Sequence, residues 1–130
     1  MPDEEVARFG SVRSNNMDLE VAAPTAVVEQ VLELLRGELP ALLIVSRYLH
    51  RPLHAHLHRL VAPGGLLLFH TFMDGAQLVG RKTPTKPRFL LNAGELRETF
   101  QNEFDVLEDS VLLLPDKRPT SCFLARRKQE

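Results

Sequence analysis

Two apolar runs, separated by about one helix length, constrain this chain more than any other feature. Residues 41–45 (Ala-Leu-Leu-Ile-Val) and 66–69 (Leu-Leu-Leu-Phe) contain no polar side chain, which is the pattern of parallel strands buried on both faces. Between them, Leu53 and Leu57 recur at helical spacing, and a Pro-Gly-Gly turn at 63–65 ends that segment. The sequence therefore predicts a βαβ unit within an α/β domain.

Polar side chains follow directly after the first of these strands. In open α/β sheets, ligands bind outside the carboxyl ends of the strands, which makes Ser46, Arg47, Tyr48 and His50 the best-placed candidates for chemistry. Packing is the alternative interpretation, in which Tyr48 lies under the following helix and Arg47 faces solvent. No Gly-x-Gly turn between a strand and a helix occurs in the sequence.

Helical patterns lie on either side of this unit. Pro24 suits the first turn of a helix, and apolar residues then recur at helical spacing as far as Gly37, a natural stop. Asn92 and Glu95 match a capping box, in which the Asn side chain accepts a hydrogen bond from the third helical N–H while Glu95 reaches back. We therefore expect one helix before the unit and one after it, the second running to Phe100.

Further strands and one long connection complete the pattern. Residues 104–114 and 120–126 are typical of two strands joined by a short Pro-containing turn, and residues 12–19 have weaker strand character. Between residues 73 and 91, Gly and Pro punctuate a connection without periodic pattern. Connections of this length are uncommon in compact domains and often serve as lids or binding loops.

This arrangement resembles the later half of the class I S-adenosylmethionine-dependent methyltransferases. A hydrophobic strand that ends in Ser46 to Tyr48 is followed by a helix, the turn at 60–65 and a second strand. The run Val45–Leu53 (VSRYLHRPL) is most similar to the small domains of tellurite-resistance-type methyltransferases. The resemblance extends from about residue 12 to residue 125.

The resemblance implies a Rossmann-like three-layer α/β/α fold that ends in an antiparallel strand pair. In that family the sheet order is 3-2-1-4-5-7-6, and the strand at 41–45 takes the fourth place. The first strands and the Gly-rich cofactor loop of the family have no counterpart before Asp18, so we expect a domain that is incomplete at its N-terminus. Residues 1–10 are then a flexible segment, 11–126 a partial methyltransferase domain, and 127–130 a tail.

The resemblance also implies a cofactor, S-adenosyl-L-methionine, and roles for residues around it. Asp18 would accept a hydrogen bond from the adenine amino group, and the backbone N–H of Leu19 would contact a ring nitrogen. The alternative is that Asp18 only caps a turn before Pro24. Ser46 and Arg47 would lie beside the methionine part of the cofactor.

Tyr48 and His50 are the implied catalytic residues. Methyl transfer is an in-line displacement that depends on positioning, and either side chain can also take a proton from the acceptor. The acceptor itself is not identified by these residues. Because the cofactor loop has no counterpart, we expect this chain alone to bind the cofactor weakly and to have little activity. The alternative is a catalytically silent methyltransferase-like module that binds a partner.

Four histidines lie on the segment that follows the first strand. His50, His54 and His58 recur at intervals of four residues, and such pairs on one helical face can bind a metal ion. No third ligand lies nearby in sequence, and Arg51 and Arg59 add positive charge. We therefore expect a solvated histidine-rich face and no metal site.

Charge and cysteine content narrow the class of protein. A net charge of −1 over 130 residues argues against electrostatic nucleic-acid binding as the main activity. The single cysteine, Cys122, excludes an intramolecular disulfide, and no apolar run approaches 18 residues. We expect a soluble protein of a reducing compartment, first the cytoplasm, with the nucleus and mitochondrial matrix left open, and no association with a membrane.

Two surface features suggest partners. Basic residues cluster in the long connection, where they could meet an anionic acceptor or could form an ordinary solvated loop; these are Arg81, Lys82, Lys86 and Arg88. The strand at 41–45 would also have an exposed edge, since its family neighbours have no counterpart in the chain. Such an edge is a template for pairing, so we expect self-association.

Overall fold

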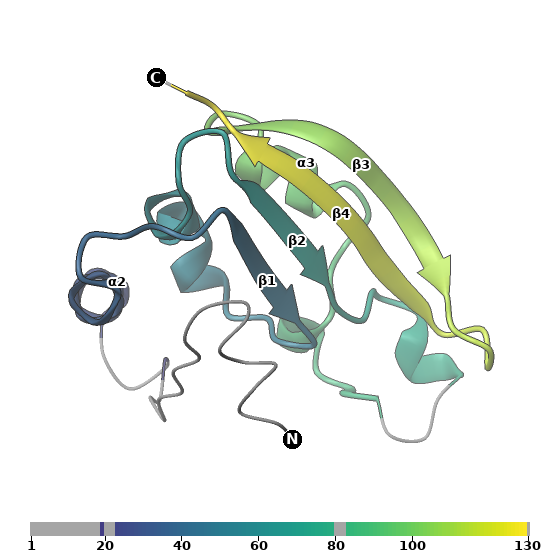
Figure 1. Cartoon of the computed structure of the whole chain (residues 1–130). Helices are drawn as coiled ribbons and strands as arrows, with labels where there is room; N and C mark the ends of the chain where they lie inside the picture. The colour runs from purple at the N-terminus through teal and green to yellow at the C-terminus, as the bar shows by residue number, and fades with distance from the viewer. Residues whose placement is uncertain (1–18, 20–22, 80–82, 130) are drawn as a thin grey trace, which may run out of the picture.

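The computed structural model describes residues 19, 23–79 and 83–129. These residues form a four-stranded sheet whose order is β1-β2-β4-β3 (Figure 1). The strands are β1 (Leu42–Ser46), β2 (Leu66–His70), β3 (Phe104–Leu113) and β4 (Pro119–Arg127). β1 and β2 are parallel, whereas β4 is antiparallel to both β2 and β3.

The observed strand order confirms the predicted half-sheet. With β1 in the fourth place of the expected order, the described strands follow as 4-5-7-6. The parallel pair comes first along the chain and the antiparallel pair last, as the sequence predicts. The strand expected at 12–18 lies outside the described residues.

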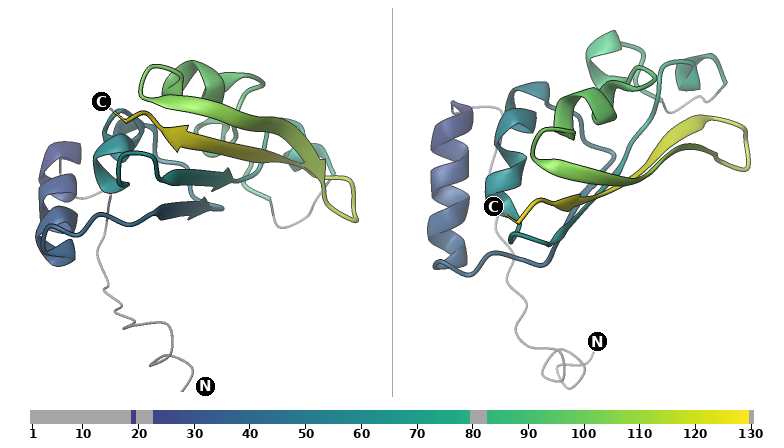
Figure 2. Two further views of the ribbon diagram at one scale, coloured as in Figure 1. Left: turned by 45° about the horizontal axis from the view of Figure 1, so that its top comes forward. Right: turned by 90° about the horizontal axis from the view of Figure 1, so that it is seen from above.

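Three helices longer than a single turn accompany the sheet within the described residues. They are α2 (Pro24–Leu35), η1 (Arg51–Leu60), which is wound as a 3₁₀ helix, and α3 (Glu95–Phe100). Figure 2 shows η1 and α3 on one face of the sheet, with α2 beside η1. The long connection holds two further 3₁₀ turns, η2 (Ala76–Leu78) and η3 (Pro87–Phe89). In the described part of the chain, no helix combines the length and the apolar character that crossing a membrane requires.

The ends of α2 follow from its sequence. Pro24 occupies the first turn, where the missing N–H of proline costs no hydrogen bond. Val27 and Val28 are buried along the inner stripe of the helix. Arg36 and Gly37 have φ angles of 54° and 80°, and this left-handed pair ends the helix one turn before Pro40. The predicted helix and its stop are confirmed.

The start of α3 differs from the expected capping box. The carboxylate of Glu95 does reach back, since it accepts a hydrogen bond of 3.1 Å from the backbone N–H of Asn92. However, the Asn92 side chain makes no cap, and the helix begins after Gly94, which has a φ of 79°. Half of the motif is therefore confirmed, and the other half is wrong because a left-handed glycine separates Asn92 from the helix.

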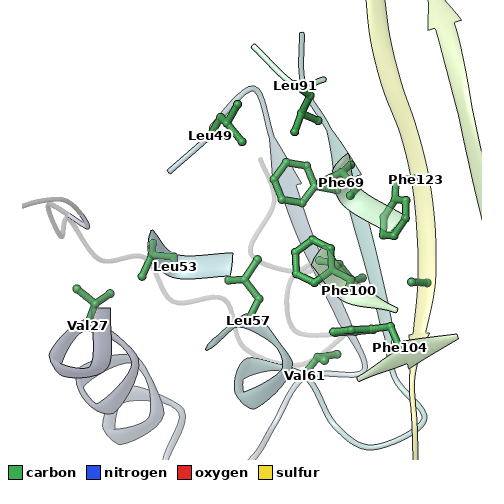
Figure 3. Close-up of a cluster of buried hydrophobic side chains, with 13 residues drawn as sticks. Val27, Leu49, Leu53, Leu57, Val61, Phe69, Leu91, Phe100, Phe104 and Phe123 are labelled. Atoms are coloured by element: carbon green, nitrogen blue, oxygen red, sulfur yellow. The ribbon is translucent and has the colours of Figure 1, made fainter. Parts of the chain in front are cut away.

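Aromatic side chains fill the core between the sheet and the helices. Phe69 of β2, Phe100 of α3, Phe104 of β3 and Phe123 of β4 are all at most 1 % exposed. The ring of Phe100 lies 5.6 Å from that of Phe104 and 6.0 Å from that of Phe123, centroid to centroid (Figure 3). Packed aromatic pairs of this kind add to the free energy gained by burial. They hold α3 against β2, β3 and β4.

The opposite face of the sheet is not covered by any described element. Leu42 and Ile44 of β1 are 47 % and 56 % exposed on that face. Their neighbours across the parallel register are Leu66 and Leu68, which are half-buried. The parallel pair of β1 and β2 is therefore apolar on both faces, although described helices pack on only one of them.

One arginine joins η1 to the segment that precedes α3. Arg51 forms an ion pair with Glu95, and its Nη2 donates to Glu95 Oε1 at 2.9 Å. The same guanidinium donates to the backbone carbonyls of Arg88, at 3.0 Å, and Leu90, at 2.9 Å. The hydrogen bond between the side chains lowers the pKa of Glu95 and raises that of Arg51. We call this group the Arg51 clamp.

We predict that Arg51→Met lowers the free energy of unfolding by about 2 kcal/mol, because Glu95 and two backbone carbonyls lose a charged donor. Arg59→Met is the matched control, since it breaks the more exposed pair with Glu29 and should cost less than about 0.5 kcal/mol. Urea unfolding of both variants measures the difference. Equal losses would show that the clamp has no special structural role.

Candidate functional site

A pocket lies along β1, between the strand, η1 and α2. Its volume is about 310 Å³. Its walls are mainly apolar, with polar side chains from the carboxyl end of β1. The lining residues are Leu19, Val27, Val31, Leu43, Ile44, Val45, Ser46, Tyr48, His50, Leu53, His54, Leu57, Leu60 and Phe69. We call this the β1 pocket.

Four of the predicted site residues line the β1 pocket. Ser46 ends β1, and Tyr48 and His50 follow it before η1 begins. The rings of Tyr48 and His50 lie 6.4 Å apart, centroid to centroid. Leu19 lines the same pocket, far from the others in sequence. The structure thus brings together residues that sequence reasoning assigned to the cofactor and to catalysis.

Arg47 and Asp18 are not part of this group. Asp18 lies outside the described residues, so its predicted role stays a prediction. Arg47 has a φ of 51°, a left-handed conformation that places its side chain in a second pocket rather than in the β1 pocket. Ser46 and Arg47 are adjacent in sequence and are both predicted to lie beside the cofactor, but they line different pockets.

The second pocket lies at the carboxyl ends of β1 and β2 and has a volume of about 190 Å³. It is lined by Arg47, Tyr48, Leu49, Thr71, Phe72, Pro84 and Phe89. Tyr48 lines both pockets. We call this second site the Phe72 pocket.

His54 corrects the expectation of a solvated histidine face. His54 is only 6 % exposed. The centroid of its ring lies 5.4 Å from that of the Phe69 ring and 5.6 Å from that of the Phe100 ring. The expectation is wrong because the side of η1 that carries His54 packs against β2 and α3, where Phe69 and Phe100 contact its ring. His54 therefore shares the buried face of η1 with Leu53 and Leu57. His56 and His58 remain half-buried.

Burial changes the protonation of His54. Removal from water lowers its pKa to about 4, and the nearby Arg51 and His50 act in the same direction, while Glu95 opposes it. His54 is therefore neutral near pH 7. Among the described residues, no three side chains of His, Cys, Asp or Glu are grouped so that they could hold a metal ion.

The β1 pocket fits part of the expected cofactor. Its aliphatic walls suit a planar heterocycle, and Ser46, Tyr48 and His50 offer polar groups at one end. Its described lining contains no carboxylate, which is the group that would accept hydrogen bonds from ribose hydroxyls. The described residues thus fit the base and the polar end better than the sugar.

Comparison with known proteins shows which fold this arrangement belongs to. No protein-family model matches the chain, and no curated protein matches it in sequence. Among solved structures, it is similar to the N-methyltransferase NodS from Bradyrhizobium japonicum WM9, with a TM-score of 0.50 and 18 % identity over 70 % of this chain and 52 % of that one. It is also similar to TehB from Haemophilus influenzae, with a TM-score of 0.55 and 14 % identity over 97 % of this chain and 45 % of that one.

These likenesses confirm the predicted fold class. The chain has a partial Rossmann-like α/β fold similar to that of the N-methyltransferase NodS and of TehB, so the predicted resemblance to methyltransferases is confirmed at the level of the fold. At identities of 14 % and 18 %, the likeness is one of fold. The chain spans about half the length of both matched structures.

We predict that the chain loses stability as the pH falls from about 6.5 to about 4. The pKa of His54 is lowered in the folded state, so the unfolded chain binds this proton more readily and acid favours unfolding. The expected loss is about 2 kcal/mol, measured as the free energy of unfolding in urea at several pH values. The pKa of Glu95 is also lowered in the folded state, so its protonation at still lower pH causes a further loss of stability.

The matched control separates His54 from the other histidines. His54→Phe keeps an aromatic ring beside Phe69 and Phe100 and removes the histidine whose pKa is lowered to about 4, so it should greatly reduce the dependence between pH 6.5 and 4. His58, whose pKa is also lowered by burial, accounts for the part that remains. His56→Gln changes a half-buried histidine of the same helix and should leave the pH dependence unchanged. An unaltered slope in His54→Phe would contradict the assignment.

Proposed function

We propose that this chain takes part in S-adenosylmethionine-dependent methyl transfer and supplies the loop after β1 to the cofactor and the acceptor. The main support is the position of Ser46, Tyr48 and His50 at the carboxyl end of β1, on a pocket, in a sheet ordered as in methyltransferases. In open α/β folds this end of the sheet is where ligands bind. NodS, one of the similar structures, is an N-methyltransferase.

The residues of the loop have different tasks in this proposal. Ser46 offers a hydroxyl to the polar end of the cofactor, which supplies the methyl group when it is bound. Tyr48 lies between the two pockets and orients the acceptor, since it lines both. His50 accepts the proton that the acceptor loses. Leu19 covers one face of the adenine, and Asp18 remains the proposed acceptor for its amino group.

We also propose that this chain alone binds the cofactor weakly. The described pocket lining has no carboxylate for the ribose, and each polar group of a ligand that is left unpaired costs binding free energy. The outer edge of β1 is not paired with any described strand, so the pocket is open along that side. High activity would then depend on additional contacts to the cofactor, above all to its ribose.

Nuclear magnetic resonance of the full chain with S-adenosylmethionine tests this function. We expect a dissociation constant weaker than about 0.1 mM, with shifts concentrated at Leu19, Ser46, Tyr48 and His50. Tyr48→Ala should reduce these shifts, and Arg59→Gln should not, because Arg59 pairs with Glu29 away from the pocket lining.

Two results would contradict the proposal in different ways. Shifts that are absent, or that lie elsewhere, would exclude the β1 pocket as the cofactor site. A micromolar dissociation constant that is abolished by Asp18→Ala would contradict the expected weakness and would show that residues near Asp18 complete the site.

A second candidate function is a methyltransferase-like interaction module without catalysis. The supporting observation is the exposure of Leu42 and Ile44 on the uncovered face beside the unpaired edge of β1. β1 contains no charged residue, whereas β3, at the other edge, contains Asp105, Glu108 and Asp109. Charged side chains discourage pairing at a sheet edge, so the edge of β1 is the better template for a second copy of the chain.

We predict that the chain self-associates through β1 and that Ile44→Lys reduces this association. The lysine places a charge on the apolar edge strand, which opposes pairing with another copy. Light scattering after size-exclusion chromatography gives the mass. Val111→Lys is the matched control, since Val111 of β3 is similarly exposed at 54 %. A monomer at 100 μM, or equal effects of both variants, would contradict pairing through β1.

A further inference from the structure

The Phe72 pocket combines aromatic walls with arginine side chains. The guanidinium carbons of Arg47 and Arg118 lie 5.3 Å and 5.0 Å from the centroid of the Phe72 ring. The guanidinium carbon of Arg88 lies 4.7 Å from the centroid of the Phe89 ring. Both rings line the pocket. Each aromatic wall therefore carries at least one cation within cation–π distance.

The positive charge of these arginines is only partly neutralised. Arg118 pairs with Asp116 at 2.8 Å and also donates a hydrogen bond to Thr83. Arg47 and Arg88, in contrast, have no carboxylate partner among the described residues. Of the three arginines, Arg47 lines the pocket itself, so among the described residues it is the cation whose donors can bind an anion there.

The backbone holds Arg47 in an unusual conformation. A φ of 51° is uncommon for a residue other than glycine, and it costs free energy unless the surroundings maintain it. A hydrogen bond of 2.7 Å from the N–H of Arg47 to the carbonyl oxygen of His70 contributes to this, since it ties the residue to the end of β2. The left-handed turn directs Arg47 to the Phe72 pocket, away from Ser46 and the β1 pocket.

We propose that the Phe72 pocket binds a small aromatic carboxylate, with its carboxylate on Arg47 and its ring against Phe72 and Phe89. A planar guanidinium matches a carboxylate in a two-bond geometry, and aromatic walls favour a flat apolar body. The volume of about 190 Å³ suits a single-ring molecule. Treating this molecule as the methyl acceptor rests on the proposed function, because Tyr48 joins the two pockets, whereas the binding itself does not.

Benzoate is a suitable probe for this site. We expect that titration of the isotope-labelled full chain with sodium benzoate shifts the resonances of Arg47, Thr71, Phe72 and Phe89, with a dissociation constant on the order of 1 mM. Benzamide has the same ring without the charge and should bind at least about tenfold more weakly. Inorganic phosphate, which lacks a ring, should also bind at least about tenfold more weakly.

Variants assign the binding to Arg47. Arg47→Gln should weaken benzoate binding at least about tenfold. Arg47→Lys should weaken it less, because the positive charge remains although the planar guanidinium is lost. Arg59→Gln is the matched control and should bind benzoate as the unaltered chain does. Amide spectra of each variant establish that it is folded. Phe89→Leu, at a half-buried position, tests the aromatic wall without removing a charge and should also weaken binding.

Several results would overturn this assignment. They are the absence of benzoate-dependent shifts in the Phe72 pocket, equal binding of benzamide, and unchanged binding in a folded Arg47→Gln chain. Cofactor binding is read separately, from the resonances of Ser46 and His50 in the β1 pocket. If the unaltered chain binds the cofactor but not benzoate, this site is refuted. If it binds benzoate but not the cofactor, the proposed function is refuted.

Discussion

The Arg51 clamp is the interaction on which the arrangement of both pockets depends. Arg51 stands at the start of η1, directly after the loop that carries Tyr48 and His50, and it binds Glu95, 44 residues further along the chain. Its bonds to the carbonyls of Arg88 and Leu90 also hold the end of the long connection. One partly buried guanidinium thus ties the loop after β1 to the segment that closes the Phe72 pocket.

The aromatic core explains why η1 can carry a histidine toward the interior. Phe69 and Phe100 surround the His54 ring and exclude water, so the charged form of His54 is disfavoured. The ring acts as an aromatic core side chain at neutral pH. The same burial that joins η1 to β2 and α3 makes this junction sensitive to acid, because protonation would place an unsolvated charge there.

Neighbouring residues of the loop after β1 line different pockets. Side chains of Ser46 and His50 line the β1 pocket, Arg47 lines the Phe72 pocket, and Tyr48 lines both. This division requires the left-handed turn at Arg47, because an extended residue would continue the alternation of the strand. In the proposed function, one loop thereby serves two ligands, and Tyr48 is the side chain that separates them.

The sequence alone determined the local elements of this protein. Uninterrupted apolar runs, the helical spacing after Pro24 and the Pro-Gly-Gly turn at 63–65 predicted β1, β2 and α2 close to their observed bounds. The resemblance to class I methyltransferases added the order of the last four strands, 4-5-7-6, which the structure confirms. These features were predictable because periodicity and turn chemistry act between neighbours in sequence.

Only the tertiary structure decided the chemistry of the site. Burial of His54 depends on Phe69 and Phe100, which lie 15 and 46 residues away along the chain, and no local pattern indicated these contacts. The partner of Arg51 lies 44 residues away, and the side-chain direction of Arg47 follows from a single left-handed φ. Water exclusion and charge pairing act between surfaces that meet only after folding, and for that reason the sequence identified these residues without determining what they contact.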